Sequence, residues 1–292
     1  MSTDLSSRRR LGRRLPEPVS NGVRRAQQLW GTATAGTRME PSFIVVGAQR
    51  CGTTTLYRLL SGHPDVVRPT MAKGIGYFDL NYERGDRWYR GHFPVAGRAH
   101  DHRRRAAFES SGYYCFHPLA AARIAADLPD VQLVMMVRDP VERAHSAYKH
   151  ERARGFEDLD FAAALDAEPR RLEGEVERMI AEPGYQSFDH RHHAYVGRGR
   201  YAEQVDRLHS TVGRDRVRLL DADRFFQDPR REFADLTDWL GLSSWDPEVV
   251  PQENARPGDV LSDGLRDRLR QEFDESDEAL AEHLGRPPSW RD

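Results

Sequence analysis

A glycine-bounded turn between an apolar run and an amphipathic segment constrains the fold of this chain more than any other feature. Residues 42–47 form a short apolar run that ends in glycine, which is typical of a buried strand. Residues 53–61 place three leucines on one helical face, and Gly-His-Pro ends that helix. The turn at 47–54 reads Gly-Ala-Gln-Arg-Cys-Gly-Thr-Thr. Because a helix that starts after such a turn offers free backbone N–H groups to an anion, the pattern predicts a strand, a phosphate-binding loop and a helix.

Further strands and helices alternate along the chain. Apolar runs predict strands at 131–137 and 217–221, and a weaker one at 106–109. Helical patterns lie between and after these runs, at 119–128, 140–154, 201–211, 230–240 and 264–284. Strands that alternate with helices pair in parallel and carry helices on both faces. The sequence therefore predicts the α/β class: a three-layer P-loop-like fold with a central, mostly parallel sheet flanked by helices.

The predicted ordered domain spans residues 39–292. Residues 1–38 are rich in arginine and are interpreted as a disordered basic arm. Its Ser-Arg-Arg-Arg start is similar to a twin-arginine export signal, but no apolar segment follows it. Within the domain, residues 155–195 begin with a charged stretch that has no strand signal, and they are interpreted as a lid or an acceptor-side insertion.

Composition restricts the partners and the compartment. A formal net charge of −2 argues against a nucleic-acid partner, which usually binds a strongly basic domain. The two cysteines, Cys51 and Cys115, do not make a disulfide framework and suit a reducing compartment. No run approaches the ~18 apolar residues of a membrane span. We therefore expect a cytoplasmic protein without integral membrane association, whose oligomeric state the sequence does not reveal.

The glycine turn lacks the lysine of nucleotide hydrolases. Its spacing matches G-x-x-x-x-G-K-[ST], but Thr53 stands where that lysine would reach the β- and γ-phosphates. The nearest cation is Arg50, inside the loop. Backbone donors, two hydroxyls and one cation suit a single 5′-phosphate with an attached leaving bond better than a triphosphate. A P-loop kinase or nucleotide hydrolase stays an alternative, as does a tight turn that needs glycine only for its positive φ.

A second polar set follows the strand at 131–137. Arg138 comes directly after this strand, at the carboxyl end, where ligands bind in open α/β sheets. Its planar guanidinium suits two oxygens of a phosphate. The alternative interpretation is that Arg138-Asp139-Pro140 only starts and caps a helix.

These motifs resemble the sulfotransferases that use 3′-phosphoadenosine 5′-phosphosulfate (PAPS), particularly the heparan-sulfate and related bacterial branch. The resemblance runs from about residue 41 to residue 290. Its specific segments are Val-Val-Gly-Ala-Gln-Arg-Cys-Gly-Thr-Thr-Thr-Leu at 45–56, His-Pro-Asp-Val at 63–66, Tyr-Phe-Asp at 77–79, Val-Arg-Asp-Pro-Val-Glu-Arg at 137–143, Ser-Ala-Tyr at 146–148, Gly-Arg-Tyr-Ala at 199–202 and Gly-Arg-Pro-Pro-Ser-Trp at 285–290.

The resemblance implies that PAPS is the co-substrate and that the partner is an acceptor hydroxyl on a carbohydrate, a lipid or a small molecule. It implies that Arg50 stands where a lysine usually neutralises the bridging oxygen. Arg138 and Ser146 would hold the 3′-phosphate, and Arg256 would close over the nucleotide. The cofactor-binding residues it implies are Arg50, Cys51, Gly52, Thr53, Thr54, Arg138, Ser146 and Arg256.

The catalytic pattern of that branch is broken in this chain. The branch carries a glutamate base and, two residues later, a histidine, but Gly74 and Gly76 stand at these positions. Because an alcohol acceptor needs a general base, Asp79 is the first candidate carboxylate and Glu109 the second. Lys73 is interpreted as an additional positive charge near the sulfuryl group.

Three alternatives to an intact catalytic site stay open. Each of the charged candidates could be an ordinary surface charge. The chain could also be a nucleotide-binding module whose chemistry has decayed. The two glycines could instead open the pocket for a bulky acceptor.

The sequence predicts no metal. Residues 189–193 read Asp-His-Arg-His-His, but histidines at these offsets do not all face one point on a helix. No partner cysteine or carboxylate motif accompanies them. We interpret this segment as a polar rim of the acceptor cleft.

Overall fold

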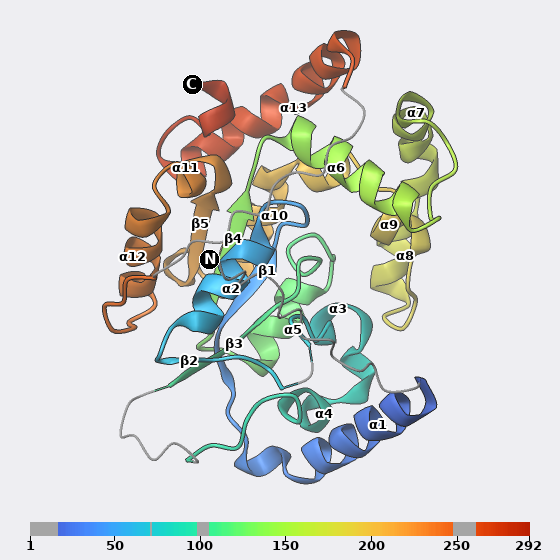
Figure 1. Ribbon diagram of the computed structural model, residues 1–292. Helices are drawn as coiled ribbons and strands as arrows, with labels where there is room; N and C mark the ends of the chain where they lie inside the picture. Colours follow the sequence, from blue (N-terminus) through green and yellow to red (C-terminus); the bar gives the residue numbers. More distant parts are fainter. Residues whose placement is uncertain (1–16, 71, 98–104, 248–260) are drawn as a thin grey trace, which may run out of the picture.

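The computed structural model describes residues 17–70, 72–97, 105–247 and 261–292. Its centre is a five-stranded sheet in the order β2-β3-β1-β4-β5, in which every pairing is parallel (Figure 1). The strands are β1 (Pro41–Gly47), β2 (Val66–Val67), β3 (Ala106–Ser110), β4 (Gln132–Val137) and β5 (Val217–Asp221). The predicted α/β class and parallel sheet are confirmed, and the short strand β2 is an addition to them.

Helices cover both faces of the sheet. In Figure 1, α2 (Thr53–Gly62) lies in front of it, whereas α5 (Ala120–Asp127) and α10 (Tyr201–Val212) pack against each other behind it. In the strand order, the chain continues from β1 to β2 on one side and from β4 to β5 on the other side. This reversal makes a switch point between the carboxyl ends of β1 and β4. Ligands bind at this point in open α/β sheets.

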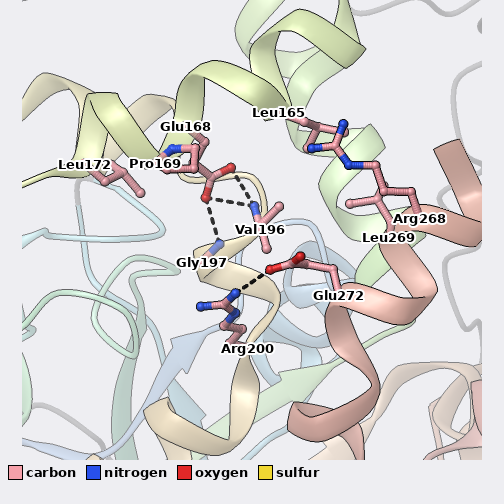
Figure 2. A pocket seen from close by; sticks show the side chains of 10 residues that line it. All are labelled: Leu165, Glu168, Pro169, Leu172, Val196, Gly197, Arg200, Arg268, Leu269 and Glu272. Carbon is pink, nitrogen blue, oxygen red and sulfur yellow. Dashed lines mark hydrogen bonds and ion pairs between the residues drawn. The ribbon is translucent and has the colours of Figure 1, made fainter.

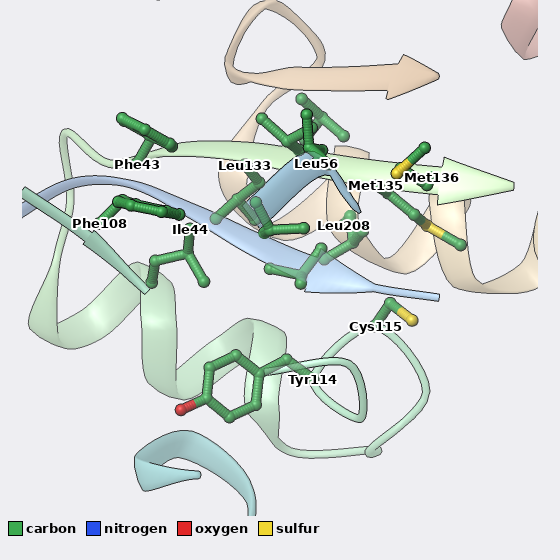
Figure 3. Close-up of a cluster of buried hydrophobic side chains, with 14 of the residues drawn as sticks. Phe43, Ile44, Leu56, Phe108, Tyr114, Cys115, Leu133, Met135, Met136 and Leu208 are labelled. Atoms are coloured by element: carbon green, nitrogen blue, oxygen red, sulfur yellow. The ribbon is translucent and has the colours of Figure 1, made fainter. Parts of the chain in front are cut away.

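The strands β1 and β4 run through the middle of the hydrophobic core. Figure 3 shows Ile44 of β1 and Leu133 of β4 among the buried side chains of Leu56 from α2 and Leu208 from α10. All four side chains are fully buried. Because helices cover both faces, these strands read as continuous apolar runs and not as alternating ones.

The other helices surround this centre. They are α1 (Glu17–Ala33), α3 (Tyr77–Leu80), α4 (Asp86–Arg90), α6 (Pro140–Ala153), α7 (Phe161–Leu172), α8 (Glu175–Ala181), α9 (Phe188–His192), α11 (Ala222–Gln227), α12 (Pro229–Trp239) and α13 (Asp263–Leu284). A 3₁₀ turn, η3 (Gly197–Gly199), precedes α10. In the ranges that the structure describes, no helix is long and apolar enough to cross a membrane.

The N-terminal segment differs from its prediction. Residues 17–33 form α1, whereas the sequence was expected to be disordered through residue 38; residues 1–16 lie outside the described ranges. The helix packs on α4, where Gly31 and Gly91 meet so closely that a Cβ on Gly31 would lie 2.4 Å from the Gly91 carbonyl oxygen. The sequence did not predict this contact, because a close approach of two glycines leaves no apolar signal in the sequence.

Residues 155–195 fold as α7, α8 and α9, without a strand. Phe161 and Leu165 of α7 join Val141 of α6 and Phe273 of α13 in a second, smaller hydrophobic cluster. The segment is therefore anchored on the helices beside the sheet. Its role as a lid or an acceptor-side insertion stays a prediction.

Candidate active site

The glycine turn lies at the carboxyl end of β1, at the switch point. Gly52 has a φ of +85° and Arg50 a φ of +72°. A Cβ at position 52 would also lie 2.7 Å from the ring of Phe226, so the turn requires glycine there. Within the described ranges, no carbonyl accepts a hydrogen bond from the backbone N–H groups of Gly52, Thr53 or Thr54. These donors are available to an anion at the start of α2.

Two cations belong to this turn: Arg50 lies within it, and Lys73 reaches it from the segment between β2 and α3. The Arg50 Nε donates a hydrogen bond of 3.0 Å to the Ser146 Oγ on α6. The Lys73 Nζ lies 3.3 Å from the Thr53 Oγ1 and 3.2 Å from the Thr54 Oγ1. The fold thus brings a lysine to a loop that has none of its own. It places Lys73 beside Thr53 and Thr54 and links Arg50 to Ser146.

Arg138 lies half-buried at the carboxyl end of β4, the neighbour of β1. The following Asp139 caps α6, since its Oδ1 accepts a hydrogen bond of 2.8 Å from the Val141 N–H. The helix-capping interpretation is therefore correct for Asp139. The cap does not involve the Arg138 side chain, and Arg138 lies at the same switch point as the glycine turn.

Two further predicted nucleotide residues have different outcomes. The Cys51 side chain is buried, with its Sγ 3.4 Å from the Tyr201 hydroxyl, and burial raises the pKa of the thiol. Only the backbone of Cys51 can face a ligand, because the thiol packs the turn onto the core. Arg256 lies outside the described residues.

A cavity of about 360 Å³ adjoins the turn at Gln49; we call it the acceptor-side cavity. Its lining residues are Gln49, Gly74, Ile75, Gly76, Asp79, Leu80, Asn81, Ser110, Ser111, Gly112, Tyr113, Arg154, Arg191, His192 and Arg198. The first candidate base, Asp79, belongs to it and is 8% exposed. Burial raises the pKa of Asp79 to about 6, against the opposing effects of the Leu80 N–H and the Arg191 charge.

The second candidate base, Glu109, is not among the residues that line this cavity. Its fully buried carboxylate accepts hydrogen bonds from the Ile75 N–H at 2.9 Å, the Ser111 hydroxyl at 2.7 Å and the Tyr114 hydroxyl at 3.0 Å. Burial raises the pKa of Glu109 to about 6, although these hydrogen bonds oppose the rise. Glu109 therefore ties the segment before α3 to β3, which is a structural task.

Packing explains the two glycines that replace the expected catalytic pair. A Cβ at Gly74 would lie 2.6 Å from the Ser110 carbonyl oxygen and 2.9 Å from the Ser111 Oγ. Gly76 has a φ of +64°, and a Cβ there would lie 3.1 Å from the Asp79 Oδ1. Both glycines line the acceptor-side cavity, but β3 occupies the space that a side chain at position 74 would need.

Arg198 is a site residue that sequence reasoning missed. Its Nη1 donates a hydrogen bond of 2.5 Å to the Gln49 Oε1, and its Nη2 donates to the carbonyl oxygens of His190 and Arg191. The guanidinium lies 4.7 Å from the centre of the Tyr113 ring, and burial lowers its pKa. The neighbouring Gly-Arg-Tyr-Ala motif was the available signal, but nothing in the sequence distinguishes a buried arginine from a surface one.

The side chains of residues 189–193 have two different environments. Arg191 and His192 line the acceptor-side cavity, and the His192 Nδ1 is 2.9 Å from the Glu151 Oε2. The His193 Nδ1 instead pairs with the Asp189 Oδ1 at 2.5 Å. In the part of the chain that the structure describes, no three histidines, cysteines or carboxylates are grouped so that they could hold a metal ion.

A second cavity, of about 300 Å³, lies between α7, α13 and the turn before α10 (Figure 2). We call it the α7–α13 cavity. Figure 2 shows Glu168 accepting hydrogen bonds from the backbone N–H groups of Val196 and Gly197, and Arg200 paired with Glu272.

Comparison with known proteins decides the family. Residues 40–255 match the family described as "Sulfotransferase domain". The chain belongs to the sulfotransferase family. Its fold is also similar to that of a sulfotransferase from Alicyclobacillus acidocaldarius, with a TM-score of 0.69 and 28% identity over 87% of this chain and 100% of that one. The predicted family is thereby confirmed, and the chain has the fold of a transferase enzyme.

The curated relatives are much longer proteins. The bifunctional heparan sulfate N-deacetylase/N-sulfotransferase 2 of Bos taurus is 31% identical over 175 residues, which are 56% of this chain and 19% of that protein. The bifunctional heparan sulfate N-deacetylase/N-sulfotransferase 1 of Caenorhabditis briggsae is 26% identical over 210 residues, or 69% of this chain and 23% of that protein. The chain thus spans about a fifth of the length of these relatives.

Proposed function

We propose that this sulfotransferase transfers the sulfuryl group of PAPS to an acceptor hydroxyl. The observation that carries the proposal is the set of open backbone donors at the glycine turn, together with Arg50 in the turn itself and Lys73 bonded to the Thr53 and Thr54 hydroxyls. Helix-terminal N–H groups with two adjacent cations suit a phosphosulfate, whose bridging oxygen gains negative charge as the sulfuryl group leaves. The absence of a lysine at position 53 speaks against the alternative of a P-loop kinase or hydrolase.

The residues present fit PAPS at both of its charged ends. Gly52, Thr53 and Thr54 would hold the 5′-phosphate through their backbone donors, while Arg138 and Ser146 would hold the 3′-phosphate. PAPS supplies the activated sulfuryl group. The chain binds and orients this group and stabilises the charge that develops on the leaving oxygen.

Asp79 is the general base of the proposed reaction. As the acceptor oxygen bonds to sulfur, its proton passes to the Asp79 carboxylate, and the bond from sulfur to the bridging oxygen breaks. A base with a pKa near 6 is ionised at neutral pH and still accepts a proton readily. Asp79 would thus supply the carboxylate that the site lacks at position 74.

The names of the curated relatives indicate a broad class of acceptor. The names of the curated relatives include heparan sulfate, a carbohydrate, so a carbohydrate hydroxyl is the acceptor that we favour. A cytoplasmic location, as the two cysteines suggest, remains part of the proposal.

Titration calorimetry with nucleotides tests the donor assignment. We expect 3′,5′-adenosine diphosphate to bind at least about tenfold more tightly than 5′-AMP, because a charged hydrogen bond to the 3′-phosphate is worth about 1.5–3 kcal/mol. The preference should disappear in Arg138→Gln and should not depend on magnesium. Equal affinities for the two nucleotides in the unaltered chain, or tighter binding of ATP with magnesium, would remove the proposal. A labelled-sulfate transfer assay then measures the activity itself.

A further inference from the structure

The acceptor-side cavity carries more positive than negative charge. Three guanidinium groups line it, those of Arg154, Arg191 and Arg198, and among the described residues of its lining only Asp79 carries a carboxylate. Behind the lining, Glu151 pairs with Arg154 at 3.4 Å and with His192 at 2.9 Å. When Glu151 is counted with Asp79, these three arginines still outnumber the two carboxylates by one.

Arg198 is buried without a carboxylate. Its side chain is 5% exposed and its hydrogen-bond acceptors, an amide and two carbonyl oxygens, are neutral. Among the described residues it has no ion-pair partner, and an arginine does not lose its proton. Buried charges are normally paired, so this one raises the preference of the cavity for an anion.

Arg191 and Arg154 present the guanidinium groups that a ligand can reach. Arg191 is partly exposed, its side chain forms no hydrogen bond or ion pair with any described residue, and it acts on Asp79 only at a distance. Arg154 is 41% exposed and lies over the Phe156 ring, 4.4 Å from its centre. Planar guanidinium groups of this kind bind oxyanions through paired hydrogen bonds.

From these charges we infer that the acceptor is itself an anion. Its carboxylate or ester sulfate binds Arg191 and Arg154, and this contact turns its hydroxyl toward Asp79 and the glycine turn. The inference rests on the proposed function and adds the class of acceptor to it. A cavity of about 360 Å³ has room for one sugar ring or one aromatic acid, so a single anionic unit occupies it.

Binding of matched charged and neutral probes tests this inference without any turnover. Titration calorimetry of the full chain, with saturating 3′,5′-adenosine diphosphate, compares glucuronate and glucose 6-sulfate with glucose, and 4-hydroxybenzoate with 4-hydroxybenzyl alcohol. We expect a charged probe to bind about tenfold or more tightly than its neutral partner. The sugar pair distinguishes a carboxylate from an ester sulfate as the preferred anion.

Variants locate the preference. Arg191→Gln should bring the ratio of charged to neutral affinity close to one, and Arg191→Lys should keep part of it. Arg178→Gln is the matched control, because Arg178 on α8 pairs with Glu182 and lies outside the cavity lining. Melting temperatures show whether each variant is folded.

Three results would overturn the inference: equal binding of charged and neutral probes in both sets, an unchanged ratio in the Arg154→Gln/Arg191→Gln double variant, or no binding by any probe. Failure of the donor assignment is separate from these results. It would appear as lost affinity for 3′,5′-adenosine diphosphate, whereas the probe ratio can also be measured without nucleotide.

Discussion

The acceptor-side cavity and the α7–α13 cavity are similar in size, about 360 and 300 Å³, but they differ in how their charges are compensated. In the α7–α13 cavity, Arg200 pairs with Glu272, and Arg268 pairs with Asp166 at 2.7 Å. In the acceptor-side cavity, Arg191 has no ion-pair partner among the described residues. The compensated charges of the α7–α13 cavity hold helices together, whereas Arg191 in the acceptor-side cavity keeps a guanidinium group that our inference assigns to the acceptor.

Removal of the Asp79 carboxylate is the strongest test of whether the acceptor-side cavity is the catalytic one. Asp79→Asn should lower kcat by about 10²–10⁴, the usual share of general-base catalysis, with little change in nucleotide affinity. Steady-state kinetics with the labelled-sulfate assay measure the effect, and Asp130→Asn, at an exposed position, is the control. If Asp79→Asn keeps full kcat and Glu109→Gln does not, the base lies on β3 and our assignment is wrong.

An arginine of the glycine turn, which adjoins the acceptor-side cavity, and an arginine of the α7–α13 cavity give the next largest contrast. Arg50→Ala should reduce transfer by about 10²–10³, because it removes a charge that stabilises the leaving oxygen. Arg200→Ala in the α7–α13 cavity should leave kcat within about twofold. Comparable losses in both variants would mean that the α7–α13 cavity also takes part in catalysis.

The raised pKa of Asp79 predicts opposite effects of pH on activity and stability. The rate should fall as the pH drops below about 6, since the protonated carboxyl is no base. The folded protein holds this proton more tightly than the unfolded chain, so the ionised carboxylate costs stability above pH 6. Asp79→Asn should therefore raise the free energy of unfolding by about 1–3 kcal/mol at pH 8 and by little at pH 4. Denaturant titrations at the two pH values measure this; a variant that is less stable at pH 8 would contradict it.

The smallest effect is expected for the ion pair between Arg200 and Glu272. These side chains are 42% and 44% exposed, and ion pairs at such positions contribute less than about 1 kcal/mol. Glu272→Gln should lower the free energy of unfolding by no more than this, and added salt should reduce the difference. A loss of several kcal/mol would show that the α7–α13 cavity depends on this pair far more than its exposure implies.

Local patterns made most of the fold predictable, whereas the acceptor side depended on contacts between distant residues. The strands β1 and β4 were predictable because burial on both faces leaves an unbroken apolar run. The glycine turn was predictable because positive φ requires glycine. Arg198 was not predictable, since its contact with Gln49 joins residues 149 positions apart. Lys73 was assigned near the sulfuryl group, but its contact with the turn depends on how the chain returns from β2.

The close packing of Gly74 against β3 limits the routes by which the site can change. A glutamate at this position would need a Cβ only 2.6 Å from the Ser110 carbonyl oxygen, so a single codon change does not restore the carboxylate that the heparan-sulfate branch carries. The backbone of β3 or of the segment before α3 would have to move first. A carboxylate at position 74 therefore requires a change of the backbone as well as of the side chain. Evolution and protein engineering can more readily adjust the acceptor chemistry of this chain from Asp79 and the arginines around it.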